Sequence, residues 1–217
     1  MEGIHTMQIK GKVINFLGDS ITEGHGASSV ETRFTSLMAS KYGATVRNYG
    51  IGGTRIAKQI RPSENARWDL DFCTRATEMD PEADVVVVFG GTNDFGHGDA
   101  PLGTFEDRDP YTFYGACHTL FTTLIDRYPT ATIVCMTPLH RGVEEKPAEG
   151  RVLRVFVDAL TEVCAYYAIP TLDLYRTSGI QPQVPSVKER LCPDGLHPND
   201  AGHVLIASRL AGFLGTL

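Results

Sequence analysis

Residues 84–89 read Asp-Val-Val-Val-Val-Phe, and the run ends at the pair Gly90-Gly91. Four consecutive β-branched residues favour a strand that is buried on both faces, as in the centre of a parallel sheet. Such a strand needs neighbouring strands on both sides and helices over both faces of the sheet. This stretch therefore predicts an α/β domain.

Segments with the length of strands or the spacing of helices lie on both sides of this run. The other expected strands are 12–17, 45–49, 131–136 and 170–174, and the expected helices are 31–42, 69–79, 111–127, 150–167 and 199–214. Strands that alternate with helices predict five parallel strands joined by right-handed crossovers and covered on both faces. No linker or repeat interrupts this pattern, so we expect one domain over residues 1–217. Residues 1–11 are expected to form a loose N-terminal extension, with Met7 as an alternative start that would make the first six residues dispensable.

Composition narrows the class of protein. A net charge of -6 without a basic cluster argues against nucleic acid as a partner. No apolar run approaches the ~20 residues that span a bilayer, and the first residues lack a secretory h-region, so we expect no membrane association. Five cysteines, an odd number without a CxxC pair, predict reduced core thiols and a cytoplasmic location. A homo-oligomer remains open.

Polar motifs follow the first two expected strands. The first is Gly18-Asp19-Ser20, in which the Ser20 hydroxyl is either a nucleophile at the sheet edge or an N-cap of the next helix. The second is the glycine-rich stretch 50–53, which either brings a backbone N–H of Gly53 to a ligand or forms a plain tight loop. Both motifs are expected at the carboxyl edge of the sheet, where sites in open α/β folds form.

Two further motifs lie later in the chain. Asn93 follows the valine-rich strand, and its amide is either an uncharged donor to a developing oxyanion or part of an Asn-Asp turn. Asp194 and His197 precede the last expected helix, and the carboxylate would orient the imidazole as a base for Ser20. His197 is otherwise an incidental residue of a helix-entry turn or a metal ligand, although no second ligand lies at metal spacing.

These four motifs resemble the four blocks of the SGNH hydrolases, also called GDSL esterases, in the same order from about Val13 to the last helix. The first block reads Gly-Asp-Ser-Ile instead of Gly-Asp-Ser-Leu. The resemblance implies a flavodoxin-like three-layer α/β/α sandwich with a five-stranded parallel sheet. It also implies a serine esterase that uses neither a metal nor an organic cofactor.

The resemblance also implies roles for the motif residues. Ser20 would be the nucleophile, His197 the base and Asp194 the group that orients His197. The oxyanion hole would consist of the Ser20 N–H, the Gly53 N–H and the Asn93 amide. The expected partner is a small-molecule ester.

Residues near these motifs are candidates for substrate binding. They are Asp19 beside the nucleophile, Arg55 and Trp68 in a segment rich in arginine, Phe95 in an irregular stretch, and His140 after the fourth strand. Arg141 and His97 are considered beside them. For Arg55 and Trp68 the alternative is a solvated arginine and a half-buried tryptophan on a helix.

The absence of a long apolar lid or a cationic amphipathic helix favours a small soluble ester over a lipid interface. Among such esters we expect short-chain acyl groups, an acetyl group above all, on carbohydrates. The alternatives are a non-catalytic carbohydrate-binding protein on the same fold, a lysophospholipase, a thioesterase, an arylesterase and an acyltransferase. The sequence does not choose among natural substrates.

Overall fold

The computed structural model describes residues 7–217, and it confirms the expected α/β class and the five-stranded parallel sheet. The strand order is β2-β1-β3-β4-β7, the order of flavodoxin-like sheets. The strands are β1 (Val13–Gly18), β2 (Thr45–Gly50), β3 (Val85–Phe89), β4 (Thr132–Met136) and β7 (Thr171–Leu172).

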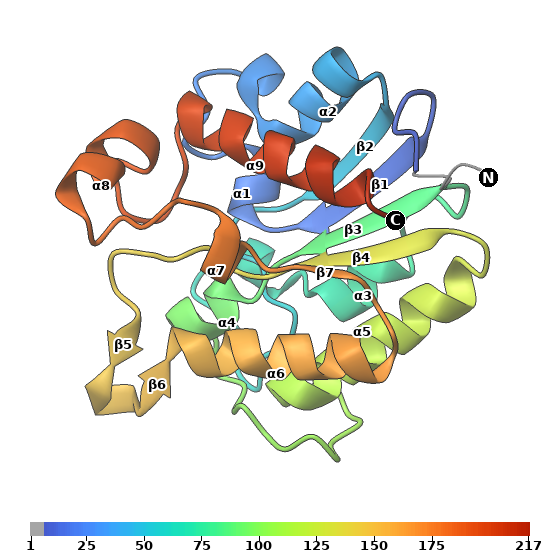
Figure 1. Ribbon diagram of the computed structural model, residues 1–217. Helices are drawn as coiled ribbons and strands as arrows, with labels where there is room; N and C mark the ends of the chain where they lie inside the picture. The colour runs from blue at the N-terminus through green and yellow to red at the C-terminus, as the bar shows by residue number, and fades with distance from the viewer. Residues whose placement is uncertain (1–6) are drawn as a thin grey trace.

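Helices cover both faces of the sheet, as Figure 1 shows. One face is covered by α2 (Phe34–Tyr42) and α9 (Asp200–Leu214). The other is covered by α3 (Phe72–Ala76), α5 (Phe113–Arg127) and α6 (Leu153–Tyr166). The result is the three-layer sandwich that the family resemblance implies.

The valine run of β3 is buried on both faces. Val85 and Val87 pack in the core beneath α2 and α9, whereas Val86 and Val88 pack in the core beneath α3, α5 and α6. All four side chains are fully buried. The alternation follows from the period of two in a strand, and it explains why neither face of this segment carries a polar residue.

Some expected elements have different bounds. The expected helix 31–42 is divided into a 3₁₀ turn at Val30–Thr32 and α2, and the expected helix 69–79 is reduced to the short α3, which follows a 3₁₀ turn at Ala66–Asp69. The fifth strand is shorter than expected, because Asp173 accepts a hydrogen bond from the backbone N–H of Arg176 and starts α7 (Leu174–Thr177). A local cap therefore overrides the β-propensity of this segment.

Several short elements were not expected. They are α1 (Ser20–Glu23), α4 (Thr92–His97), α8 (Pro185–Leu191), the two-stranded hairpin of β5 (Glu145–Lys146) and β6 (Arg151–Val152), and the 3₁₀ turn at Pro147–Glu149 between them. None is long enough to show a hydrophobic period. In Figure 1, α8 and the hairpin lie at the end of the sheet away from the two termini.

The described part of the N-terminal extension, residues 7–11, is not loose, so that part of the expectation is wrong. Met7 and Ile9 pack partly buried against the core beneath α2 and α9, and the Gly11 N–H donates to the carbonyl of Gly43 at 2.9 Å. Residues 1–6 lie outside the described residues. All five cysteines are buried and unpaired, as expected. Within residues 7–217, no helix has both the length and the apolar character needed to cross a membrane.

The register of the strands sets where the site forms. Gly18 pairs with Gly50 on one side and with Phe89 on the other, and Phe89 pairs in turn with Met136. The first four strands therefore end at the same level. The loops that follow them share one edge of the sheet, which is the position that the motif analysis requires.

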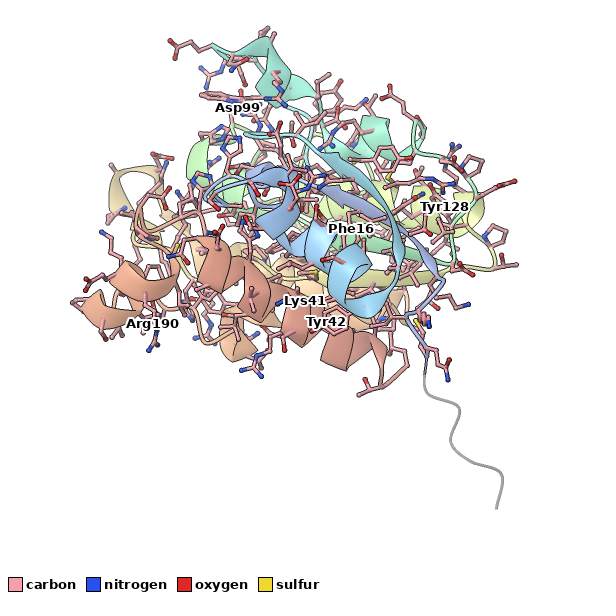
Figure 2. The ribbon with its side chains drawn as sticks, turned by 90° about the horizontal axis from the view of Figure 1, so that it is seen from above. Phe16, Lys41, Tyr42, Asp99, Tyr128 and Arg190 are labelled. Carbon is pink, nitrogen blue, oxygen red and sulfur yellow. The ribbon has the colours of Figure 1, made fainter. Side chains whose placement is uncertain are left out.

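The aromatic centre of the core supplies a stability test. Phe16 in β1 is fully buried and meets Phe34 edge to face, with ring centroids 5.6 Å apart, and it lies well inside the molecule in Figure 2. Phe16→Ala should lower the free energy of unfolding by about 3–5 kcal/mol, because it removes buried area and leaves a cavity. Urea denaturation measures this change. Ile60→Ala, at a side chain that is 61% exposed, is the control and should stay within about 0.5 kcal/mol of the parent.

Candidate active site

Ser20 is the first residue of α1, directly beyond β1. The carboxylate of Asp19 caps this helix by accepting the backbone N–H of Ile21 at 3.1 Å. Because Asp19 is the cap, the Ser20 hydroxyl is available, and its Oγ lies 3.0 Å from Nε2 of His197. Ser20 does not act as the N-cap that the alternative interpretation required.

The loop before α9 places the imidazole of His197. Nδ1 of His197 lies 2.7 Å from Oδ2 of Asp194, and Oδ1 of Asp194 accepts the backbone N–H groups of Leu196 and His197. Gly195 permits this tight turn with a φ of 80°. The structure thus brings together the hydroxyl, the imidazole and the carboxylate that lie far apart in the sequence.

The hydrogen bonds around Asp194 determine its charge. Partial burial raises the pKa of this carboxyl, but the two backbone N–H donors and the imidazole outweigh that effect and hold the pKa below its ordinary value. Asp194 is therefore ionised at neutral pH. An ionised partner favours the tautomer that carries its proton on Nδ1 and leaves Nε2 free to accept a proton from Ser20.

Two further donors face the same cavity as Ser20. The loop after β2 holds Gly53 at a φ of 78°, and its backbone N–H donates to no other described residue. The amide nitrogen of Asn93 donates one hydrogen to the carbonyl of Thr54 at 3.0 Å, which leaves its second hydrogen for the cavity. The N–H of Ser20 heads α1 and has no helical acceptor. The three expected oxyanion donors therefore gather around Ser20.

Asn93 depends on the short helix α4, whose carbonyl groups are bound by cations from the segment after β4. Arg141 donates to the carbonyl of Thr92 at 3.1 Å, Arg151 donates to that of Asp94 at 3.1 Å, and Lys146 donates to that of Gly96. Lys146 and Arg151 lie near the last carbonyls of the helix, where its dipole favours cations. A six-residue helix is unstable alone, so these contacts hold Asn93 in place.

Charged side chains are buried directly beneath the site. Burial is the main cause that raises the pKa of Asp19 to about 7 and the pKa of Asp94 to about 6. Arg75, also buried, donates to the carbonyls of Gly18 and Tyr49. Arg75 thereby ties the ends of β1 and β2 together beneath Ser20.

The cavity beside Ser20 has a volume of about 360 Å³. Most of the described residues that line it are polar, and Trp68 and Leu196 are the large apolar side chains among them. The lining residues are Ser20, His25, Gly52, Gly53, Asn65, Arg67, Trp68, Asn93, Gly96, His97, Arg141, Leu196 and His197.

Of the expected substrate contacts, only Trp68 lines this cavity. Arg55 is 2% exposed and is held behind the wall by Asp69 and Ser63, at 2.7 and 2.6 Å. Asp19 is buried as the cap of α1. The placement expected for these two charged residues is therefore wrong, because each satisfies a buried hydrogen-bond network.

Phe95 and His140 also lie away from the cavity. Phe95 is fully buried and packs against Phe156, with ring centroids 6.2 Å apart. His140 packs against Tyr175, with ring centroids 3.9 Å apart, and its Nδ1 lies 2.6 Å from Oε1 of Glu144. Neither of these two expected substrate contacts lines the cavity, because each side chain turns into the packing between loop and helix.

His97 and Arg141, which were considered beside the expected contacts, line the cavity. His97 packs against Trp68, with ring centroids 4.8 Å apart, and Arg141 follows His140. His25 lies 5.4 Å from the ring of His197 and was not expected, although its position five residues after Ser20 was a usable signal. Burial lowers the pKa of His97 to about 4, so this imidazole is neutral at neutral pH. Within residues 7–217, no three His, Cys, Asp or Glu side chains gather as a metal site.

Comparisons with known proteins find a matching family model and similar proteins. The sequence model of the GDSL-like lipase/acylhydrolase family matches residues 16–205. A solved structure from Lactobacillus plantarum is 31% identical, covers 95% of this chain and 97% of its own, and superposes with a TM-score of 0.82. The GDSL lipase Rv0518 of Mycobacterium tuberculosis is 23% identical over 220 residues, which are 95% of this chain and 83% of that protein.

A more distant structure shares the fold. It is a variant of an acetyl-xylooligosaccharide esterase from Geobacillus, and it is 21% identical. The match covers 96% of this chain and 97% of that chain, with a TM-score of 0.58.

The contact of Gly53 with Trp68 gives a direct test of the loop after β2. A Cβ at Gly53 would lie 2.0 Å from Cδ1 of Trp68, so Gly53→Ala should displace this ring. Because Trp68 is the only tryptophan, its fluorescence emission should shift. Gly150→Ala is the matched control, since Gly150 has a φ of 64° but no neighbour within 4 Å. It carries the same backbone strain and should leave the emission unchanged. An unchanged spectrum in both variants would contradict the described loop.

The pKa of Asp19 predicts a pH effect on stability. Its folded-state pKa of about 7 exceeds the ordinary value, so the native state binds more protons than the unfolded state between about pH 4 and 7. The contribution of Asp19 to stability must then fall as the pH rises through this window. Asp19→Asn removes this titrating group. The unfolding free energy of the variant minus that of the parent should therefore increase from pH 4.5 to pH 7. Urea denaturation at both pH values checks this, with the exposed Asp126→Asn as control.

Proposed function

This chain belongs to the GDSL-like lipase/acylhydrolase family, a family of ester hydrolases, and we propose that it is a serine esterase that removes an acetyl group from a small ester. The observation that carries the proposal is the chain of contacts from Ser20 Oγ to His197 Nε2 at 3.0 Å and from His197 Nδ1 to Asp194 at 2.7 Å. This arrangement suits nucleophilic acyl transfer.

In the first step, His197 takes the proton of Ser20 while Oγ attacks the ester carbonyl carbon. A tetrahedral intermediate forms, and the carbonyl oxygen becomes an oxyanion. The ionised Asp194 stabilises the imidazolium that results. The bond to the alcohol oxygen then breaks, and His197 gives its proton to the leaving alcohol.

The oxyanion would accept hydrogen bonds from the N–H groups of Ser20 and Gly53 and from the amide of Asn93. All three donors are uncharged, so they stabilise the intermediate without titrating near neutral pH. Loss of one such donor typically lowers the rate by ~10²–10³. Because the glycine loop and α4 are fixed by packing, these donors need little rearrangement during the reaction.

Water completes the cycle. His197, free again as a base, would take a proton from water as it attacks the acyl-enzyme carbonyl. A second tetrahedral intermediate in the same oxyanion hole collapses, the acid leaves, and Ser20 recovers its proton.

The shape and the lining of the cavity support a short acyl group and a polar alcohol. Its volume is about 360 Å³, and among the described residues that line it only Trp68 and Leu196 offer large apolar surface to a long acyl chain. Trp68 beside Asn65 offers a flat face and hydrogen-bond groups that suit a sugar ring. The Geobacillus esterase of similar fold acts on acetylated xylooligosaccharides, which agrees with an acetylated carbohydrate here. The unpaired thiols support a reducing compartment such as the cytoplasm.

Hydrolysis of p-nitrophenyl esters from acetate to octanoate tests the proposal. The wild type should cleave the C2 ester fastest, because Trp68 and Leu196 alone offer little apolar surface to longer chains. Ser20→Ala should lose about 10³-fold or more in kcat, since it removes the nucleophile. Ser40→Ala, an exposed serine of α2, is the matched control and should retain the wild-type rate.

Two results would contradict the proposal. Equal rates for wild type and Ser20→Ala would show that Ser20 is not the nucleophile. Faster cleavage of octanoate than of acetate would exclude the preference for short acyl groups.

A further inference from the structure

The cavity beside Ser20 is lined by positive and neutral groups, although the whole chain has a net charge of -6. Two arginines, Arg67 and Arg141, contribute to the lining. Among the described residues that line it there is no aspartate or glutamate. A cationic cavity in an acidic protein favours a substrate with negative charge.

Arg67 is already neutralised by a neighbour. Its guanidinium donates to Oε1 of Glu23, and Oε2 of Glu23 accepts the N–H of Gly52 at 2.6 Å. Half of the Arg67 side chain is also exposed, so water screens it. Arg67 is therefore poorly suited to select an anion.

Arg141 differs, because it is held in place without an acidic partner. Nη1 donates to the carbonyl and to the hydroxyl of Thr92, at 3.1 and 3.2 Å, and the guanidinium lies 5.3 Å from the ring centre of Phe95. Gly96 leaves room for it, since a Cβ there would lie 2.9 Å from Nη1. Glu144 accepts the backbone N–H of Arg141 at 3.1 Å and so fixes the loop.

The remaining donors of Arg141 are free. Within residues 7–217, no carboxylate oxygen lies within 4.0 Å of its guanidinium, and Nε and Nη2 donate to no other residue. Three carboxyl groups act on it from further away. Asp19 is buried with a raised pKa, Asp194 is bound to His197, and Glu144 accepts from His140 and Tyr175. Each is engaged elsewhere, so the guanidinium presents an unpaired edge to the cavity.

We propose that the alcohol part of the substrate carries an oxyanion group, a carboxylate or a phosphate, and that Arg141 binds it. This inference rests on the proposed function: if the acyl group is acetyl, only the alcohol part has room for a charge. A planar guanidinium with two adjacent free donors suits such a group, because it donates to two oxygens of the anion. Positioning before binding limits the entropy lost when the anion arrives.

Acetyl esters that differ in charge test this proposal. The anionic substrates are 4-acetoxybenzoate and 4-acetoxyphenyl phosphate, and the neutral reference is 4-acetoxybenzamide. The wild type should prefer at least one anionic ester in kcat/KM, and the preferred one tells carboxylate from phosphate. Arg141→Gln should reduce the ratio of anionic to neutral kcat/KM by about 10- to 100-fold, the strength of a hydrogen bond to a charged group. Arg141→Lys should keep part of the preference.

Arg61→Ala is the matched control. It removes one positive charge from a side chain that is 82% exposed and lies outside this cavity, so the ratio should not change. An equal ratio in wild type and Arg141→Gln, or a wild type that prefers the neutral ester, would overturn the proposal. In either case measurable hydrolysis would leave the proposed esterase function intact.

If no ester is cleaved, the proposed function is overturned, but a binding measurement still tests the proposed anion site. Calorimetric titration with phenyl phosphate, 4-hydroxybenzoate and 4-hydroxybenzamide needs no turnover. The wild type should bind an anion more tightly than the amide, and Arg141→Gln should lose that difference. Equal binding of all three ligands by the wild type would overturn the proposed anion site.

Discussion

The level at which the parallel strands end is the constraint on which the site depends. Gly18 in β1 pairs with both Gly50 and Phe89, so β1, β2 and β3 end at the same level of the sheet. Arg75 reinforces this level from below by donating to the carbonyls of Gly18 and Tyr49. Because the ladder bonds of a parallel sheet permit few registers when both faces are buried, the core that fixes the strands also fixes the distances between the loops.

Long-range hydrogen bonds fix the position of α4, a helix that is too short to be stable by itself. Six residues are too few for a stable helix in water, yet its carbonyl groups accept hydrogen bonds from Arg141, Lys146 and Arg151. These donors come from a segment about 50 residues further along the chain. The buried carboxyl of Asp94 adds a second anchor by accepting the N–H groups of Ile56 and Ala57 at 3.0 and 2.9 Å. Long-range polar contacts thus replace the stability that helix length would otherwise provide.

The sequence predicted what short-range patterns control and missed what distant contacts control. The run 84–89 predicted a buried central strand, and the alternation of strands and helices predicted the fold class. Because the four motifs follow strands, their order in the sequence also predicted that they lie close to Ser20. Phe95 and Arg55 were placed wrongly, because nothing local shows that one packs on Phe156 and the other binds Asp69. The same holds for α4 and the hairpin, whose few residues carry no period. Which of two adjacent residues, His140 or Arg141, faces the cavity is decided by Glu144 and Tyr175.

Arg141 joins the stability of the site to its recognition of substrate. One nitrogen of its guanidinium holds the carbonyl of Thr92, the residue before Asn93, while the other donors remain free at the cavity. An anion that binds these donors acts on a side chain that already holds the start of α4. Binding would therefore favour the arrangement in which the Asn93 amide and the carbonyl of Thr54 stay in contact at 3.0 Å. Because interactions count toward catalysis only when they are stronger in the transition state, a charge on the alcohol part contributes most where it also steadies the oxyanion donor.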